Sequence, residues 1–308
     1  MRTARAGSVT RNLTIGSRGS QLALWQARHV AARLDALGVP TRIEIIKTAG
    51  DHLQTASLTQ AGGKGLFTKE IEEALLEGAI DLAVHSLKDL PTEIPSGLEI
   101  AAVPEREDPR DAMVGRRLDD LNRNARVGTS SSRRAAQLLG MRPDLNVQPV
   151  RGNVDTRLRK LREGEFDAIV LAAAGLLRLG LDGEIAEILA PERICPAPGQ
   201  GALAIQTRER GEALELCRKL NHDETREAVT CERSILAALG GGCQLPMGAF
   251  AERRGKVLMA IAVVLSPDGS RRVAARGSGT REEAEELGRL VGEDLMARGA
   301  LDILAESK

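Results

Sequence analysis

Short apolar segments of strand length alternate with amphipathic helical segments over the first 180 residues, and this alternation constrains the fold more than any other feature. Aromatic residues make up only 1% of the chain and hydrophobic residues 42%, so the cores must be built from Leu, Ile, Val and Ala. Aliphatic strands of this kind are typical of parallel sheets covered by helices. The expected strands are Leu13–Gly16, Ile43–Lys47, Asp81–His85, Leu98–Val103, Ala125–Gly128, Val147–Val150 and Asp167–Ala172, and the helices include Leu66–Glu77, Ser131–Leu139 and Asp155–Arg162.

A weak internal repeat within this region indicates two α/β domains of similar plan. Residues 77–84, with the sequence EGAIDLAV, resemble residues 163–170, with the sequence EGEFDAIV. In both segments a helix is expected to end at glycine, and a buried strand is expected to begin after aspartate.

The final third has a different pattern, which predicts a small α+β domain with an antiparallel sheet. One helix, Glu224–Leu239, is expected to end at three consecutive glycines. Strands are expected at Met247–Glu252, Lys256–Leu265 and near Arg271–Gly277, followed by an amphipathic helix at Arg281–Arg298.

Charge and cysteine spacing argue against several classes of protein. The chain has 43 basic and 43 acidic residues, so any basic site must come from local clustering. The scarcity of aromatic residues does not favour a nucleic-acid reader. Cys195, Cys217, Cys231 and Cys243 have neither CxxC nor zinc-finger spacing, so neither a metal site nor a disulfide is expected.

Targeting signals are also missing from the pattern. Residues 1–12 are basic and lack an apolar core, so we expect a disordered extension there and not a secretory signal. No apolar run approaches the roughly 20 residues that a membrane span needs. A soluble, cytoplasmic protein is therefore expected, with no nucleic-acid or membrane partner.

Three polar clusters follow directly after expected strands. They are residues 85–89 (HSLKD), residues 128–134 (GTSSSRR) and residues 151–153 (RGN). Ligands of open α/β sheets bind outside the carboxyl ends of the strands. The three clusters therefore predict one shared cleft.

The cluster from Gly128 to Arg134 has the clearest pattern of an anion site. Its residues, including Thr129 and Ser131, precede or begin a helix, whose first turn has free N–H groups and positive dipole character. Arg133 and Arg134 would project about 100° apart on a helix and could hold separate carboxylates. The alternative is a solvated helix face with two surface arginines.

Further arginines strengthen the prediction of an anionic ligand. A single arginine is more often a surface charge than a ligand. Together they indicate an arginine-lined cleft in a chain of zero net charge, and therefore a substrate with several carboxylates. These residues are Arg18, Arg151, Arg157 and Arg178.

Two other residues have a chemical and a structural interpretation. Asp89, between Lys88 and Pro91, could stabilise a developing positive charge or share a proton with it, and the alternative is that it caps a turn. Cys243 follows three glycines and is either an accessible thiol or a buried loop cysteine.

Several motifs of the chain resemble those of the porphobilinogen deaminase family. They occur in order from about residue 15 to residue 250, and several are long, so the resemblance is specific. The matching segments are residues 17–27 (SRGSQLALWQA), 62–67 (GGKGLF), 84–91 (VHSLKDLP), 128–134 (GTSSSRR), 151–157 (RGNVDTR), 198–202 (PGQGA) and 240–246 (GGGCQLP).

The resemblance implies a fold of three domains. Two are α/β domains like those of periplasmic binding proteins, with the chain crossing between them twice, and the third is a small C-terminal α+β domain. The implied boundaries are residues 12–104 with 202–219, residues 109–197, and residues 223–308.

The resemblance also implies a reaction and a cofactor. In this family four porphobilinogen molecules are joined head to tail, each losing ammonia, on a dipyrromethane held by a thioether. The product, hydroxymethylbilane, is then cut free for tetrapyrrole synthesis. The cysteine that matches the anchor is Cys243.

The resemblance assigns roles residue by residue. Asp89 matches the catalytic aspartate that contacts pyrrole N–H groups and steadies the cation, and Lys64 lies in a loop over the cleft. Ser86, Lys88, Gly128, Thr129, Ser131, Arg133 and Arg134 match contacts to the cofactor, whereas Arg18, Arg151, Arg157 and Arg178 match arginines that bind acetate and propionate side chains. Gln60 departs from the family pattern, because many relatives have a second loop lysine there. A monomer is implied as well.

Two other classes of protein remain as alternatives. A non-catalytic anion-binding protein shares the two-domain plan but gives no purpose to the Cys243 loop or the third domain. An effector domain of a transcription factor would need a DNA-binding segment, and a dozen N-terminal residues are too few to form one.

Overall fold

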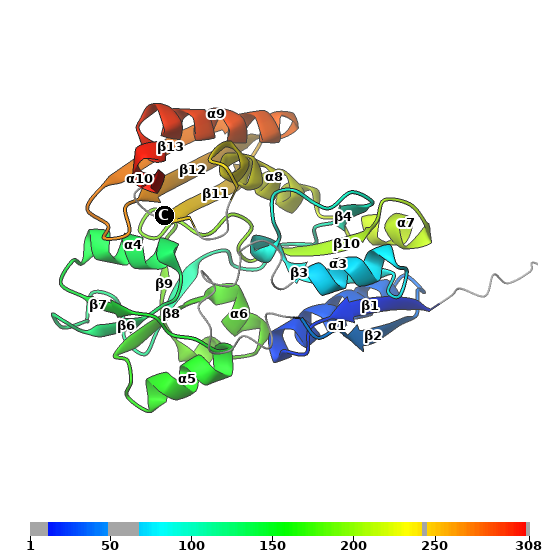
Figure 1. Ribbon diagram of the computed structural model, residues 1–308, viewed down its shortest axis with the longest axis horizontal. Helices are drawn as coiled ribbons and strands as arrows, with labels where there is room; N and C mark the ends of the chain where they lie inside the picture. The colour runs from blue at the N-terminus through cyan, green and yellow to red at the C-terminus, as the bar shows by residue number, and fades with distance from the viewer. Residues whose placement is uncertain (1–11, 49–67, 242–244, 306–308) are drawn as a thin grey trace, which may run out of the picture.

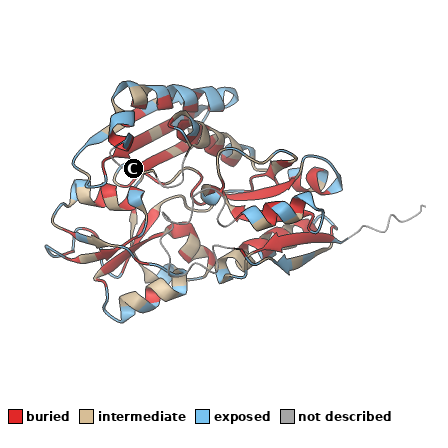
Figure 2. Cartoon of the chain, in the orientation of Figure 1, coloured by how far each residue is buried: buried red, intermediate tan, exposed pale blue. Residues whose placement is uncertain are grey.

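The computed structural model describes residues 12–48, 68–241 and 245–305, which form three lobes, each built on its own sheet (Figure 1). The strands are mostly buried and the outward faces of the helices are exposed (Figure 2). The described helices include none that is both long and apolar enough to cross a membrane.

The first lobe is a five-stranded sheet of order β2-β1-β3-β10-β4. β1 pairs in parallel with β2 and β3, whereas β10 is antiparallel to β3 and β4. Helices α1 and α7 pack on one face and α3 packs on the other. The strands are β1 (Leu13–Ser17), β2 (Thr41–Ile45), β3 (Leu82–Ser86), β4 (Leu98–Ala102) and β10 (Leu203–Arg208); the helices are α1 (Gln21–Asp35), α3 (Lys69–Leu76), α7 (Glu212–Arg218) and the 3-10 helix η1 (Leu87–Asp89).

The second lobe repeats this plan with the order β7-β6-β8-β5-β9. β6 is parallel to β7 and β8, and β5 is antiparallel to β8 and β9. The strands are β5 (Asp111–Val114), β6 (Arg126–Gly128), β7 (Asn146–Gln148), β8 (Ala168–Ala172) and β9 (Ile185–Leu189); the helices are α4 (Ser132–Met141), α5 (Val154–Arg162), α6 (Ala173–Arg178) and the 3-10 helix η2 (Asp182–Glu184).

The internal repeat of the sequence has a structural counterpart in these two sheets. Gly78 and Gly164 follow α3 and α5 with positive φ angles of 75° and 77°. Asp81 then accepts a hydrogen bond from the backbone N–H of Thr14 at 2.9 Å, and Asp167 accepts one from Arg126 at 2.7 Å. Each aspartate thus joins its own strand to the parallel strand beside it.

The chain crosses between the two lobes twice. It leaves the first sheet after β4, forms the whole second sheet, and returns to the first sheet as β10. The predicted double crossover of two α/β lobes is therefore confirmed. Strands β5, β9 and β10 were not predicted from the sequence, because their pairing partners lie far away in the sequence or outside a simple βαβ unit.

The third lobe is the predicted small α+β unit with an antiparallel sheet of order β11-β12-β13. Helices α8 and α9 cover one face of this sheet, and α4 of the second lobe packs against part of the other. The elements are α8 (Asp223–Ala238), β11 (Met247–Arg254), β12 (Val257–Leu265), β13 (Arg272–Gly279), the 3-10 helix η3 (Arg281–Glu283), α9 (Ala284–Ala297) and α10 (Ala300–Ala305).

A buried ion pair joins the third lobe to the crossover segments. Glu232 of α8 is fully buried and accepts two hydrogen bonds from Arg106, at 2.7 and 3.0 Å. It also accepts from the backbone N–H groups of Gly199 and Ala251. Because four donors meet one carboxylate away from water, the relative position of these segments depends on its charge.

We therefore predict that Glu232→Gln lowers the free energy of unfolding by about 3 kcal/mol, because it leaves the Arg106 guanidinium buried without a counterion. Urea unfolding followed by circular dichroism measures this change. Glu224→Gln on the same helix is the matched control, since Glu224 is largely exposed in its pair with Arg253 and should change stability by less than about 1 kcal/mol. Equal effects of the two substitutions would contradict the prediction.

Candidate active site

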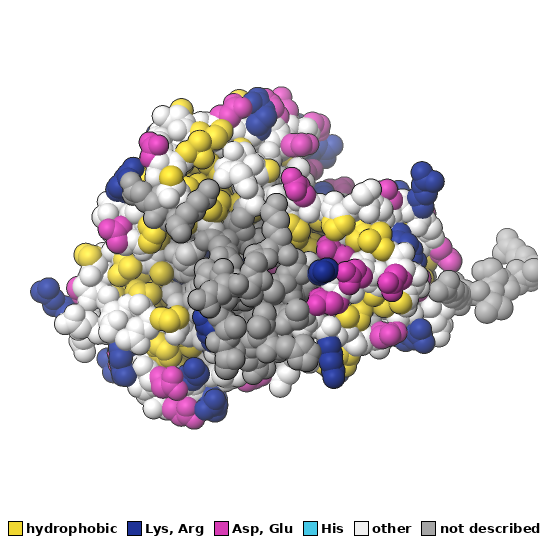
Figure 3. Space-filling view, in the orientation of Figure 1, with side chains coloured by type: hydrophobic (Ala, Val, Ile, Leu, Met, Phe, Trp, Pro, Cys, Tyr) yellow, Lys and Arg dark blue, Asp and Glu magenta, His cyan; other side chains and the backbone are white. Residues whose placement is uncertain are grey.

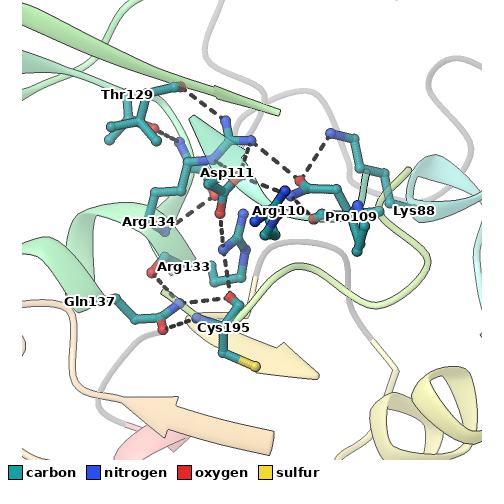
Figure 4. A network of polar contacts seen from close by, with 12 residues as sticks. Lys88, Pro109, Arg110, Asp111, Thr129, Arg133, Arg134, Gln137 and Cys195 are labelled. Carbon is teal, nitrogen blue, oxygen red and sulfur yellow. Dashed lines mark hydrogen bonds and ion pairs between the residues drawn. The ribbon is translucent and has the colours of Figure 1, made fainter. Parts of the chain in front are cut away.

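Side chains from the first two lobes meet where their strands end. Ser86 and η1 follow β3 of the first sheet, and α4 follows β6 of the second. Lys88 of η1 lies 3.4 Å from the amide oxygen of Gln200, and Arg134 of α4 lies 3.3 Å from the same oxygen. The structure thus brings two of the three predicted polar clusters to one junction (Figure 4).

Asp111, the first residue of β5, is the centre of this junction. Its side chain is fully buried and accepts hydrogen bonds from Arg133 at 2.7 Å and from Arg134 at 2.7 and 2.9 Å. The amide of Gln200 donates to it at 2.9 Å. Arg133 and Arg134 therefore converge on one protein carboxylate instead of diverging to hold two ligands (Figure 4).

The remaining donors of the two arginines bind backbone carbonyls. Arg133 donates to the carbonyl of Cys195 at 2.7 Å, and Arg134 donates to that of Val170 at 3.2 Å. These bonds hold the guanidinium groups in fixed positions at the amino end of α4, where Ser131 provides the helix cap. The pair therefore provides a rigid positive field with few free donors.

Two cations facing one carboxylate leave the junction positively charged. The neighbouring guanidinium groups hold the pKa of Asp111 well below its usual range despite its burial, so it is ionised. Burial lowers the pKa of Lys88 to about 8, with Arg134 and Arg133 contributing to the shift and Asp89 and Asp111 opposing it. Lys88 is therefore a cation at neutral pH but loses its proton in mildly alkaline solution.

Two other predicted arginines bind backbone carbonyls. Arg157 donates to the carbonyl of Gly152 at 2.8 Å, and Arg178 donates to that of Gly201 at 2.7 Å. Burial lowers the pKa of each to about 10. Among the described residues, Lys88, Arg157 and Arg178 have no carboxylate at ion-pair distance, which leaves them able to pair with ligand carboxylates.

On the outer surface the charges are mixed. Acidic and basic side chains lie near one another over the outer parts of the face in Figure 3, in keeping with the 43 basic and 43 acidic residues of the chain. Mixed charges of this kind give the outer parts of this face no single sign.

Asp89 lies at the end of η1 and is exposed. The segment that follows it is tied to the third lobe, because Arg233 of α8 donates to the carbonyls of Leu90, Pro91 and Thr92 at 2.7 to 3.3 Å. Gly241 lies against this segment, and a Cβ atom there would be only 2.7 Å from the Thr92 hydroxyl. The chain that leads to Cys243 therefore passes beside the segment that follows Asp89.

The other predicted site residues lie at several places around this junction. Ser86 accepts a hydrogen bond from Gln26 at 2.9 Å, and the Thr129 hydroxyl accepts one from the Ser131 N–H at 3.2 Å. Arg18 is partly exposed after β1, and Arg151 is exposed before α5. Gly128 packs tightly, since a Cβ there would be 2.9 Å from Ile169. Lys64, Gln60 and Cys243 lie outside the described residues.

Asp111 and Gln200, which organise the site, were not predicted from the sequence. Asp111 begins β5, and Gln200 lies just before β10. Each of these strands runs antiparallel to its neighbour, β8 or β3, and therefore begins at the edge of the sheet where that neighbour ends. Gln200 belongs to a family motif, whereas Asp111 has no signal beyond the charged run of residues 105–111 that precedes an apolar strand.

Comparison with known sequences decides the family. Residues 13–215 match the family model described as porphobilinogen deaminase, dipyromethane cofactor binding domain, and residues 226–297 match its C-terminal domain. The chain belongs to the porphobilinogen deaminase family.

Curated relatives span nearly the whole chain. A porphobilinogen deaminase of Syntrophomonas wolfei is 47% identical over 97% of this chain and 99% of its own. One of Chromobacterium violaceum is 50% identical over 95% of this chain and 97% of its own. Among solved structures, a periplasmic substrate-binding protein from Coxiella burnetii aligns with 68% of this chain and 91% of its own, at a TM-score of 0.42 and 12% identity.

We predict that Asp111→Asn lowers the free energy of unfolding by about 3–5 kcal/mol, because two guanidinium groups then stay buried without their counterion. Thermal and urea unfolding measure the loss. Asp108→Asn serves as the control, since among the described residues Asp108 has Arg110 as its ion-pair partner, in a partly exposed position. A variant as stable as the wild type would show that the two arginines find other partners.

Proposed function

We propose that this chain condenses four porphobilinogen molecules head to tail, with loss of ammonia, on a covalent dipyrromethane, and releases hydroxymethylbilane. One observation carries the proposal beyond family membership. Lys88, Arg157 and Arg178 are cations with only amide, carbonyl or aromatic partners among the described residues. Substrates with several carboxylates, such as porphobilinogen with two, would satisfy these charges.

The residues at the junction fit a dipyrromethane with four carboxylates. The buried Arg133–Arg134–Asp111 cluster keeps one excess positive charge away from water, and Lys88 adds another. Ser86, Thr129 and Ser131 would supply hydroxyl groups beside these cations. When bound through Cys243, the dipyrromethane supplies the free pyrrole α-carbon that acts as the nucleophile.

The protein's part in the reaction follows from charge and position. Arg18, Arg151, Arg157 and Arg178 would bind the acetate and propionate groups of the incoming porphobilinogen and orient its aminomethyl carbon, which supplies proximity. Loss of ammonia leaves a cationic azafulvene. The exposed Asp89 carboxylate, at the end of η1, would contact the pyrrole N–H and offset this charge as it develops.

The remaining proposals concern the setting of the reaction. We propose that the enzyme acts as a monomer in the cytoplasm, with porphobilinogen as its small-molecule partner, as family membership implies. We also propose that residues 12–104 with 202–219, residues 109–197 and residues 223–308 are its three domains. Lys64 would act from its loop over the cleft. The division into three sheets supports these boundaries.

The first test is the intact mass of the denatured protein. We expect a covalent excess equal to two condensed pyrrole units in the wild type and in Cys195→Ser, whose cysteine is buried against the third lobe. Cys243→Ser should have the mass of the bare polypeptide. A bare wild-type mass that does not change after incubation with porphobilinogen would reject the proposed function and favour an anion-binding protein.

Asp89→Asn tests the proposed electrostatic role. We expect kcat to fall by about 10²–10⁴-fold while the covalent mass excess is retained, because the amide cannot offset the cation. Consumption of porphobilinogen measures the rate. Asp120→Asn removes the same charge from an exposed position and should keep the wild-type rate. A wild-type rate in Asp89→Asn would instead indicate that the aspartate only caps the turn.

The pKa of Lys88 predicts a pH dependence of substrate affinity. Below a pH of about 8 the ammonium is charged and attracts carboxylates; as the pH rises through about 8 the charge is lost, so KM should rise. In Lys88→Arg the guanidinium keeps its charge, so KM should stay flat between pH 7 and 9.5. The same slope in both proteins would assign the titration to another group.

A further inference from the structure

A tryptophan of the first lobe lies under an arginine of the second. Trp25 is on α1, and the guanidinium carbon of Arg178, the last residue of α6, lies 5.7 Å from the centre of its ring. The imidazole of His29, one helical turn further along α1, stacks with the same indole at 5.0 Å and 9°. Helices α1 and α6 are neighbours across the two lobes (Figure 1).

Arg178 is also tied to the second crossover segment. Its Nη2 atom donates to the carbonyl of Gly201 at 2.7 Å. Gly201 has a φ of +84°, and a Cβ atom there would lie 2.4 Å from the carbonyl oxygen of Glu107 on the first crossover segment. Only glycine allows this close approach, so the carbonyl that holds Arg178 has little freedom to move.

The charge of Arg178 is met by dipoles and a ring face. Arg178 is 8% exposed, and within the described ranges no carboxylate is at ion-pair distance from it. Burial and the nearby Arg33 and Arg178 lower the pKa of His29, whereas Glu107 raises it. The imidazole is therefore mainly neutral at neutral pH and adds little repulsion to the cation over the indole.

The indole restricts where Arg178 can place its other donors. A guanidinium has five N–H groups in one plane, of which the Gly201 bond uses one. A ring face attracts the cation without accepting hydrogen bonds in the strong, directional way that a carboxylate does. The contact therefore holds the group in place and leaves donors for another partner.

We propose that Trp25 is a positioning residue of this enzyme, which holds Arg178 across the two lobes so that its remaining N–H groups meet a substrate carboxylate. The inference rests on the proposed function and deepens it, because it assigns part of substrate binding to a side chain of the opposite lobe. Trp25 acts through Arg178, and His29 supports the ring.

The kinetic test compares two substitutions. Trp25→Leu removes the ring face, and we expect KM for porphobilinogen to rise at least tenfold while kcat stays within about twofold. Trp25→Phe keeps a smaller ring face and should remain within about threefold of the wild-type KM. In an Arg178→Leu background, Trp25→Leu should raise KM no further, since the group that it positions is already missing.

A readout independent of turnover is available, because Trp25 is the single tryptophan of the chain. Its emission therefore reports on the surroundings of this one indole, which include Arg178 and His29. We expect the emission spectrum of the purified holoenzyme to differ between the wild type and Arg178→Leu, but not between the wild type and Arg162→Leu, an exposed arginine of α5.

The outcomes separate this inference from the proposed function. A wild type that consumes no porphobilinogen rejects the proposed function. If the wild type is active, a wild-type KM in Trp25→Leu overturns the positioning role of Trp25. A joint loss of kcat and thermal stability in both Trp25 variants overturns it too, because a packing role would produce that result. Identical emission of the wild type and Arg178→Leu overturns it as well.

Discussion

The ion pairs of the Asp111 carboxylate with Arg133 and Arg134 are the interaction on which the cleft depends. A buried charge is tolerated only with a counterion and satisfied hydrogen bonds, and Asp111 accepts from two guanidinium groups and the Gln200 amide. Two guanidinium groups face one carboxylate, so the cluster has one excess positive charge, which is held away from water. The protein thus has a rigid positive site whose remaining charge an anionic ligand can neutralise, although the chain as a whole has no net charge.

The double crossover brings the parts of this site together. Both antiparallel strands, β5 and β10, begin at the edge where the parallel strands β3 and β8 end. Residues just before them, including Gln200 and Gly201, therefore lie between the lobes and contact Lys88 from one side and Arg134 or Arg178 from the other. Glu232 of the third lobe fixes the same segments through Arg106 and Gly199. The geometry of the cleft is thus connected to the core of the third lobe by hydrogen bonds.

Much of the fold could be predicted from local pattern. Leu13–Gly16, Asp167–Ala172 and the helix at Glu224–Leu239 were expected within a residue or two of β1, β8 and α8, because their apolar spacing and caps are local signals. The strands β5, β9 and β10 were missed, since each is defined by pairing with segments that are not its sequence neighbours. The expected long C-terminal helix is divided in the structure, where Thr280 and Glu283 form a capping box at the 3-10 turn η3 before α9 begins.

By itself, the sequence determined the family, the alternation of strands and helices, and the identity of the cationic and acidic residues, because long motifs and periodicity do not depend on distant contacts. The tertiary structure decided what those residues contact. Arg133 and Arg134, which a helix would project apart, converge on Asp111, and Arg178 lies over Trp25 of another lobe. These outcomes depend on strand order and on the crossover, which bring together residues up to about 150 positions apart, and no local pattern encodes such contacts.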